Sequence, residues 1–532
     1  MLYSGQRVRE VAVGFWRRAE QDPSWIAVID PDGTEVRAGD LLGRVNQITS
    51  GLQAAGLRPG DGVAALLPNS SAAFEIYLAA LQGGWYLTPI NWHFTPPEIA
   101  YLIADSGARA FFAHERFAEA GPAAADLAGD ELAAAGRAVP ARFSYGEIPG
   151  FTPVAELRRG QPASTPAART AGATMHYTSG TTGRPKGVRR ALSGLTPDEA
   201  ADLGALLPML FGVTDGQPNA HLLTSPVYHT AVTVFGGGAL QMGHTIVCMD
   251  SWDSEQALAL TERYRVTNSH MVPTQFKRLL SLPEETRRRY DLSSMRWLLH
   301  AAAPCPEGIK RAMLDWWGPC IYEYYAATEG GGTLATPQDW LAHPGTVGTA
   351  WPVSEIMITD DHGNSRPPGQ PGVVYMKMDT TDFEYSGDPG KTAASRRGGF
   401  FTVGDIGYLD EDGFLFLCDR QSDMIISGGA NIYPAEIEAE IIMHPAVADV
   451  AVFGVPDAEW GEQVKAVVEP LPGAEPGDAL AADILASLEG RLARMKWPRS
   501  IDFVAALPRD PSGKLIKRRL RDPYWQGQAK AI

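Results

Sequence analysis

The stretch of residues 177–187 constrains the fold of this chain more than any other part of its sequence. It reads Tyr-Thr-Ser-Gly-Thr-Thr-Gly-Arg-Pro-Lys-Gly and holds three glycines, four small hydroxyl residues and two cations. Glycine permits positive φ angles and lets the backbone come close to a ligand. Successive backbone N–H groups in such a turn form a concavity that binds anions. The pattern predicts a polyphosphate-binding loop rather than a flexible Gly/Ser/Thr linker.

This loop differs from the phosphate loop of Walker-type nucleotidases. That motif ends in Gly-Lys-Ser/Thr, where the last hydroxyl binds Mg²⁺. Here Lys186 precedes Gly187, and Val188 follows in place of the hydroxyl residue. A different class of nucleotide-binding fold is therefore expected.

Strand-like and helix-like stretches alternate ahead of the loop. The short apolar runs 26–30, 62–67, 86–90 and 108–112 suit buried strands, and 41–55 and 71–83 have helical periodicity. Such alternation predicts a layered α/β domain with a largely parallel sheet. The alanine-rich residues 119–142 are expected to form surface helices or loop.

Composition excludes several classes of protein. The net charge of −16 over 532 residues argues against nucleic-acid binding, which needs a broad basic face. The N-terminal residues 8–19 have the spacing of an amphipathic helix, and no apolar run reaches the roughly 18 residues of a membrane span. The four cysteines form no CxxC pair, which indicates free thiols in a reducing, cytoplasmic setting.

Three further stretches carry polar residues in distinctive surroundings. Residues 321–330 read Ile-Tyr-Glu-Tyr-Tyr-Ala-Ala-Thr-Glu-Gly, residues 400–408 contain Gly-Asp-Ile-Gly, and residues 507–515 end in Pro-Ser-Gly-Lys-Leu. Together with the loop, these stretches resemble the adenylate-forming superfamily, which includes acyl-CoA synthetases, peptide-synthetase adenylation domains and beetle luciferases. The resemblance covers most of the chain.

The resemblance implies a two-part architecture. A large N-terminal domain of mixed sheets and helices would span residues 1–420, and a small α+β domain would span 421–532. The small domain would rotate about a hinge at Ser422, a position where family members often carry Asp or Lys.

The resemblance also implies an ATP site with Mg²⁺. Tyr325 would stack near adenine, Asp405 would accept the ribose hydroxyls, and Arg420 would reach the ribose or a phosphate. The implied nucleotide-binding residues are Thr178, Ser179, Gly180, Thr181, Thr182, Gly183, Lys186, Ala302, Ala303, Pro304, Tyr324, Tyr325, Asp405 and Arg420. Ala302 and Ala303 stand where a glycine is more usual, and Ala326 also replaces a common glycine.

The catalytic residues implied by the resemblance are Lys514, Thr328 and Glu329. Glu329 would bind Mg²⁺ with the Thr178 hydroxyl, since this hard cation takes oxygen ligands. Lys514 and Thr328 would act on the α-phosphate. An exposed lysine beside the basic residues 517–519 could instead serve solubility, but the Gly-Lys turn and the match to the motif favour the catalytic role.

Two further sites complete the implied machinery. His229, with Tyr228 and Phe235, would border the acyl group, although a lone histidine is more often structural. Gly428 and Gly429 would lie where the CoA thiol arrives.

The expected function is an ATP-dependent acid–CoA ligase acting through an acyl-adenylate. A fatty acid is the first choice of substrate, and an aryl acid of the cinnamate or benzoate type is the second. A free-standing enzyme that loads a carrier protein, a luciferase-type oxidoreductase and a non-catalytic adenylate-binding module are the alternatives. The oligomeric state is left open, a homodimer included.

Overall fold

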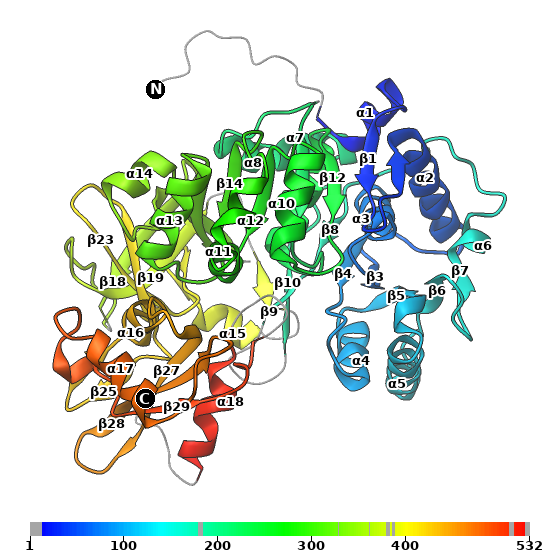
Figure 1. Cartoon of the computed structure of the whole chain (residues 1–532). Helices are drawn as coiled ribbons and strands as arrows, with labels where there is room; N and C mark the ends of the chain where they lie inside the picture. The colour runs from blue at the N-terminus through cyan, green and yellow to red at the C-terminus, as the bar shows by residue number, and fades with distance from the viewer. Residues whose placement is uncertain are drawn as a thin grey trace. The chain divides into compact units, whose positions relative to one another are not determined.

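The computed structural model describes residues 13–178, 185–216, 218–327, 329–360, 362–378, 383–385, 389–509 and 515–526 (Figure 1). The chain divides into two compact units. Unit 1 comprises Met1–His270, Pro283–Leu298 and Thr381–Thr392, and unit 2 comprises Met271–Leu282, Leu299–Thr380 and Ala393–Ile532. Each unit is described by itself.

The first sheet of unit 1 is wholly parallel, as the sequence predicts. Its strand order is β7-β6-β5-β3-β4-β8. The strands are β3 (Gly62–Leu66), β4 (Tyr86–Pro89), β5 (Ala108–His114), β6 (Ala141–Tyr145), β7 (Thr152–Pro153) and β8 (Ala173–Thr174). Every residue of β3 is buried, which explains its unbroken apolar run.

A second sheet of unit 1 has the order β13-β11-β12-β1-β2, with only β1 and β2 antiparallel. Its strands are β1 (Ile26–Ile29), β2 (Glu35–Arg37), β11 (Ala220–Leu223), β12 (Thr245–Cys248) and β13 (Asn268–Met271). The helices of unit 1 are α1 (Phe15–Gln21), α2 (Ala38–Ala54), α3 (Ser71–Gly83), α4 (Pro96–Asp105), α5 (Ala120–Ala134), α6 (Val154–Arg158), α7 (Pro197–Gly204), α8 (Leu206–Leu210), α9 (Thr230–Gln241), α10 (Ser254–Arg263) and α12 (Glu284–Arg289).

One apolar core joins the two sheets of unit 1. Val28 of β1, Val63 of β3 and Ile246 of β12 belong to the same buried cluster as Leu41 of α2 and Leu78 of α3. A separate cluster packs α4 and α5, which lie side by side (Figure 1). The sheets and the helices between them are therefore held by continuous apolar contact.

The alanine-rich segment forms a surface helix, as the sequence predicts. One face of α5 is buried and includes Ala124, Ala128 and Leu132, whereas the opposite face is exposed and includes Leu127. Alanine is small enough to let the buried face pack closely against its neighbours.

A small third sheet of unit 1 has the order β20-β10-β9. It comprises β9 (Tyr177–Thr178), β10 (Lys186–Arg189) and β20 (Glu384–Tyr385), all antiparallel. This sheet carries the ends of the predicted phosphate loop.

Unit 2 contains three antiparallel strands, a second antiparallel sheet and a C-terminal α+β part. The three antiparallel strands are β15 (Ile321–Ala327), β16 (Gly330–Ala335) and β17 (Thr349–Ala350). The second sheet has the order β21-β22-β19-β23-β24, with β18 paired to β19. These strands are β18 (Ser354–Thr359), β19 (Gly372–Met378), β21 (Arg396–Arg397), β22 (Phe400–Phe401), β23 (Asp405–Leu409) and β24 (Leu415–Arg420).

The C-terminal part of unit 2 is a small sheet of order β26-β25-β28-β27, with β29 parallel to β28. Its strands are β25 (Ile425–Ser427), β26 (Ala430–Ile432), β27 (Val447–Asp457), β28 (Gly461–Pro470) and β29 (Ser500–Phe503). The helices of unit 2 are α11 (Pro273–Leu280), α13 (Glu307–Trp317), α14 (Pro337–Ala342), α16 (Pro434–Ile441), α17 (Asp478–Ser487) and α18 (Lys517–Arg521). Strand β14 (Trp297–His300) and helix α15 (Pro389–Ala394) lie at boundaries between the units.

The C-terminal sheet has its own apolar core, made by Ile425, Ile437, Val452, Val468 and Ile484 among others. The expected α/β class with a small α+β part is confirmed, whereas the expected boundary between residues 420 and 421 stays a prediction. Within the part of the chain that the structure describes, no helix is both long and apolar enough to cross a bilayer.

Candidate active site

Two short strands bring together the ends of the predicted phosphate loop. Thr178 on β9 is opposite Lys186 on β10, and Tyr177 is opposite Gly187. A Cβ atom on Gly187 would lie 2.3 Å from Met175 Cε, so a larger residue here would require the end of the Met175 side chain to move. Ser179, Gly180, Thr181, Thr182 and Gly183 lie outside the described residues, as does the Thr178 side chain.

Helix α4 anchors both ends of the loop through two tyrosine hydroxyls. Tyr177 donates to Asp105 Oδ2 at 2.7 Å, and Tyr101 donates to the carbonyl of Pro185 at 3.0 Å. Burial and the nearby Asp105 carboxylate raise the pKa of Tyr177, so the phenol keeps its proton. Sequence reasoning missed this anchor, although Tyr101 and Asp105 have the i, i+4 spacing of one helix face.

A single buried asparagine holds the loop that carries Tyr228 and His229. The Asn69 side chain donates to the carbonyls of Ser225 and Met249, both at 3.0 Å, and accepts the Val227 N–H at 2.9 Å. All three hydrogen bonds of the Asn69 side chain are to backbone groups. They therefore fix the path of the loop that leads into α9. An asparagine after a buried strand gave no sequence signal for this role.

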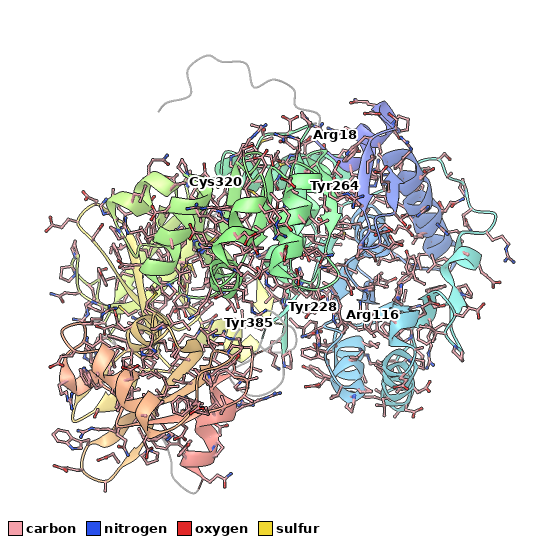
Figure 2. All side chains as sticks on the ribbon, viewed as in Figure 1. Arg18, Arg116, Tyr228, Tyr264, Cys320 and Tyr385 are labelled. Carbon is pink, nitrogen blue, oxygen red and sulfur yellow. The ribbon has the colours of Figure 1, made fainter. Side chains whose placement is uncertain are left out.

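Aromatic side chains gather around this loop. The Tyr228 ring, labelled in Figure 2, packs edge-on against Trp92 at 4.7 Å and lies 4.3 Å from the His229 ring. Further along α9, Phe235 stacks on His270 of β13, with 5.5 Å between ring centroids and 12° between planes. The assignment of Tyr228, His229 and Phe235 to an acyl site stays a prediction.

A buried histidine network lies in the sheet beside α9. His221 Nδ1 is 2.6 Å from Asn268 Oδ1, and Asn268 Nδ2 is 3.0 Å from His244 Nδ1. Because an amide oxygen only accepts and an amide nitrogen only donates, His221 carries its proton on Nδ1 and His244 on Nε2. His244 Nε2 then donates to the Thr214 carbonyl at 2.8 Å. Burial lowers the pKa of both histidines to about 4 and keeps them neutral.

In unit 2 the fold brings together three of the predicted nucleotide-binding residues. The Tyr325 hydroxyl donates to Asp405 Oδ2 at 2.7 Å, and Arg420 Nε lies 3.3 Å from Asp405 Oδ1. Arg420 is placed there because it is paired with Asp405 across β23 and β24. Burial, followed by the Asp405 carboxylate, raises the pKa of Tyr325 well above its usual value. The carboxylate is thus held by a neutral phenol and a cation.

The candidate metal ligand Glu329 is a buried residue directly before β16, in the same unit as Tyr325 and Asp405. Its charge is one of the causes that raise the pKa of Tyr325. Mg²⁺ is usually held by one or two carboxylates together with phosphate oxygens and water, so a single Glu fits this ion. Thr328 lies outside the described residues, and Tyr324 is buried on β15.

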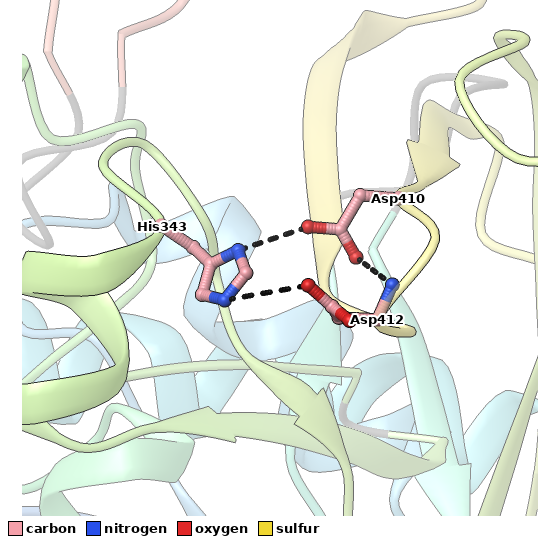
Figure 3. Close-up of side chains that lie close together, drawn as sticks. All are labelled: His343, Asp410 and Asp412. Carbon is pink, nitrogen blue, oxygen red and sulfur yellow. Dashed lines mark hydrogen bonds and ion pairs between the residues drawn. The ribbon is translucent and has the colours of Figure 1, made fainter.

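The described residues contain one cluster of metal-binding side chain types, His343 with Asp410 and Asp412. His343 Nδ1 lies 3.1 Å from Asp410 Oδ2, whereas Nε2 faces Asp412 Oδ2 at 3.9 Å (Figure 3). The imidazole also stacks on Phe414 at 3.9 Å. Each ring nitrogen faces a different carboxylate, so the histidine bridges the two acids of the β23–β24 turn.

In the predicted adenine turn, Ala302 has a backbone conformation that is unfavourable for alanine. Ala302 has φ of +76°, in the left-handed region, where glycine is preferred. Ala302 is one of the two residues that stand where the resemblance implies a glycine. Ala303 and the exposed Pro304 continue the turn.

A buried ion pair supports the turn and the neighbouring strand. Lys310 of α13 contacts Glu323 Oε2 of β15 at 2.5 Å, and His300 Nε2 lies 3.5 Å from the same oxygen. Desolvation lowers the pKa of Lys310 and raises that of Glu323, while their mutual attraction opposes both changes. Sequence reasoning missed this pair because nothing local links residues in a helix and the following strand.

The C-terminal part of unit 2 holds the remaining predicted residues. Gly428 and Gly429, with φ of +58° and +80°, form the two-residue turn between β25 and β26. The carbonyl of Ser422, the predicted hinge, accepts a bond from Arg521 of α18 at 3.2 Å. Lys514 lies outside the described residues. Arg509 and Leu515, the described residues on either side of 510–514, form an antiparallel bridge.

Models of two protein-family domains match the chain. The model "AMP-binding enzyme" matches residues 15–381, and "AMP-binding enzyme C-terminal domain" matches residues 436–514. The first match alone covers more than half of the chain.

Curated proteins and solved structures match along nearly the whole length. A feruloyl-CoA synthase from an Amycolatopsis species is 34% identical over 520 residues, 97% of this chain and 99% of that protein. The fatty acid–[acyl-carrier-protein] ligase ScoC of Streptomyces coeruleorubidus is 31% identical over 534 residues, 97% and 96% of the two chains.

Among solved structures, the anthranilate CoA ligase AuaEII, in complex with anthranoyl-AMP, aligns with a TM-score of 0.83 and 25% identity, covering 96% of each chain. This chain therefore belongs to the AMP-binding enzyme family and is an acid–thiol ligase of the CoA-ligase branch of the adenylate-forming superfamily.

Proposed function

We propose that this enzyme activates an aromatic carboxylic acid with ATP and transfers the acyl group to CoA. In the first half-reaction a carboxylate oxygen attacks the α-phosphorus, and the bond to the leaving pyrophosphate breaks. In the second half-reaction the CoA thiol loses its proton and attacks the acyl carbonyl, and AMP leaves. The products are an acyl-CoA, AMP and pyrophosphate.

The chain contributes positioning and charge rather than a nucleophile of its own. Asp405 would accept the ribose hydroxyls, and Arg420 and Tyr325 keep that carboxylate in place. Lys186 and the loop hydroxyls would hold the β- and γ-phosphates. Lys514 and Thr328 would stabilise charge that develops at the α-phosphate.

Mg²⁺ would be held by Glu329 and the Thr178 hydroxyl together with phosphate oxygens. The ion supplies neutralisation of the triphosphate charge when it is bound. Both residues are oxygen donors, which is the ligand chemistry that this cation requires.

The observation that carries the proposal is the match to ligases over 97% of the chain. A match of this extent includes both family domains. It therefore supports a proposal in which the chain carries out both half-reactions. The joining of Tyr325, Asp405 and Arg420 in unit 2 adds a site-level argument.

The aromatic class of acid is favoured by the side chains around the candidate acyl loop. Trp92, Tyr228 and His229 form one group of rings, and Phe235 with His270 forms a stacked pair. Flat rings pack well against such surfaces through offset or edge contacts. This choice reverses the order expected from the sequence, which favoured fatty acids.

A fatty acid is the second candidate, and a carrier protein is the second candidate acceptor. Both are favoured by the similarity to ScoC, whose name describes a fatty acid–[acyl-carrier-protein] ligase.

A panel of acids tests the proposal. Pyrophosphate release is measured with hydroxycinnamates, benzoates and fatty acids of increasing length, with CoA or a carrier protein as acceptor. The expected result is a higher kcat/KM for an aromatic acid and thioester formation with CoA. Preference for fatty acids would overturn the substrate class, and AMP formation only with a carrier would overturn the acceptor.

A further inference from the structure

Lysine 277 joins two regions of unit 2 that belong to different family domains. Lys277 lies on α11, within the residues matched by the AMP-binding model. Its ammonium group donates to the carbonyl of Ile442 at 2.6 Å and to the carbonyl of Val447 at 2.7 Å. Both carbonyls lie within the residues matched by the C-terminal domain model.

The two acceptors lie at the end of one element and at the start of the next. Ile442 is the C-cap of α16, and the last carbonyls of a helix have no partner within the helix. Val447 begins β27 directly after the turn that follows α16. A cation at a helix C-terminus is also favoured by the helix dipole, so Lys277 caps α16 from outside its own domain.

The Lys277 side chain is partly buried at this contact. Burial lowers the pKa of Lys277 to about 8, and the Asp449 carboxylate partly opposes the change. Asp449 is itself paired with Arg509. Two charge-assisted bonds therefore replace part of the hydration of the lysine.

A second contact lies next to the first. A Cβ atom on Gly308 of α13 would lie 2.5 Å from Met443 Cε, so Met443, which follows the C-cap of α16, sits against the start of α13. Helices α11, α13 and α16 are labelled in Figure 1. The end of α16 thus meets two helices of the other family domain.

We propose that Lys277 is a positioning residue, a latch that holds the C-terminal domain in one of the two arrangements that the half-reactions need. This inference rests on the proposed function and on the rotation of the small domain about Ser422 that the family resemblance implies. That residue lies between the two matched regions, so a rotation there moves Ile442 and Val447 but leaves α11 behind. Both bonds of Lys277 must break during the rotation.

The consequence is a bias between the two arrangements. Loss of both bonds destabilises the latched arrangement and leaves the other unchanged, so the population ratio shifts by about tenfold or more. The half-reaction that uses the latched arrangement slows, and the other half-reaction does not.

The latch is tested with Lys277→Met, which keeps the apolar stem but removes the donors. The matched control is Arg278→Met, the adjacent and exposed cation on the same helix. Adenylate formation is followed as pyrophosphate release, and thioester formation is followed from chemically supplied acyl-adenylate. The expected result is a change of about tenfold or more in the ratio of the two rates for Lys277→Met, with the wild-type ratio in the control. Equal effects on both rates, or no effect, would overturn the latch.

Hydrogen exchange gives a readout that does not depend on activity. Amides of residues 436–447 should exchange faster in Lys277→Met than in the wild-type protein, and at the wild-type rate in Arg278→Met. Unchanged exchange in Lys277→Met would also contradict the proposal. Failure of the proposed function is distinguishable, because the wild-type protein would then release no pyrophosphate with any acid.

Discussion

At the scale of single residues, Asp405 depends on partners that differ widely in sequence position. Tyr325 and Arg420 reach it from β15 and β24, and each engages a different carboxylate oxygen. A carboxylate can accept the Tyr325 hydroxyl with one oxygen and pair with the Arg420 cation through the other. A neutral side chain of the same size could not form the charged pair.

Replacing Asp405 by Asn should therefore impair nucleotide binding. The amide keeps one acceptor oxygen and presents an NH₂ group toward Arg420 or Tyr325, so we expect kcat/KM for ATP to fall about 10- to 100-fold. Steady-state kinetics with varied ATP measures this. Asp412→Asn, an exposed change in the next turn, is the control and should leave the value unchanged. Equal losses in both variants would contradict the assignment.

Ala302 predicts a stabilising substitution. Its left-handed φ of +76° costs about 1 kcal/mol for a residue with a Cβ atom, and glycine removes this cost. Ala302→Gly should raise the free energy of unfolding by up to about 1 kcal/mol, measured by denaturant titration. Ala303→Gly should act in the opposite direction, because Ala303 does not have a positive φ. A loss of stability in Ala302→Gly would show that the turn does not strain its alanine.

At the scale of elements, Asn268 of β13 joins two histidines, His221 of β11 and His244 in the connection between α9 and β12. His221 and His244 stay neutral when folded because burial lowers each pKa from 6.5 to about 4. In the unfolded chain these groups bind protons below about pH 6.5. The unfolded state therefore binds more protons between pH 6.5 and 4, and acid destabilises the folded state over that window.

Stability should thus fall by about 2 kcal/mol per histidine between pH 7 and pH 5. Chemical denaturation at a series of pH values measures the slope. His221→Asn keeps a donor near the position of Nδ1 and removes the titrating ring, so its slope should be smaller. His362→Asn, at an exposed position, is the control and should keep the wild-type slope. An unchanged slope in His221→Asn would mean that this ring does not titrate on unfolding.

At the scale of the whole molecule, the proposed cycle separates two half-reactions that need different groups. Lys514→Ala should lower the rate of adenylate formation about 10²- to 10³-fold, the usual loss when one well-placed charge-stabilising group is removed. Thioester formation from supplied acyl-adenylate should be much less affected. Rapid-quench assays of each half-reaction measure the two rates.

The control for this prediction is Arg518→Ala, a cation on α18 whose side chain is 60% exposed and which pairs with Asp522, one helix turn further on. It should leave both rates near those of the wild-type enzyme, since exposed pairs contribute little. A parallel fall in both half-reactions of Lys514→Ala would contradict the role given to Lys514.

Several features could be predicted from the sequence because their signals are local. The buried strand β3 has an unbroken apolar run, and the Gly428–Gly429 turn needs the positive φ angles that glycine allows. The loop at 177–187 and the family domains could be recognised from residue order alone, since a glycine-rich anion site is built from consecutive backbone groups.

The tertiary structure alone decided which distant groups meet. Four contacts join elements that no sequence periodicity links. They are the bond from Tyr177 to α4, the bonds of Asn69 to the loop at Tyr228, the Lys310–Glu323 pair and the bonds of Lys277. A sequence pattern reports whether a position is buried, because burial follows the local repeat of the helix or strand. It does not report which remote atom satisfies a buried polar group, because that depends on how whole elements pack.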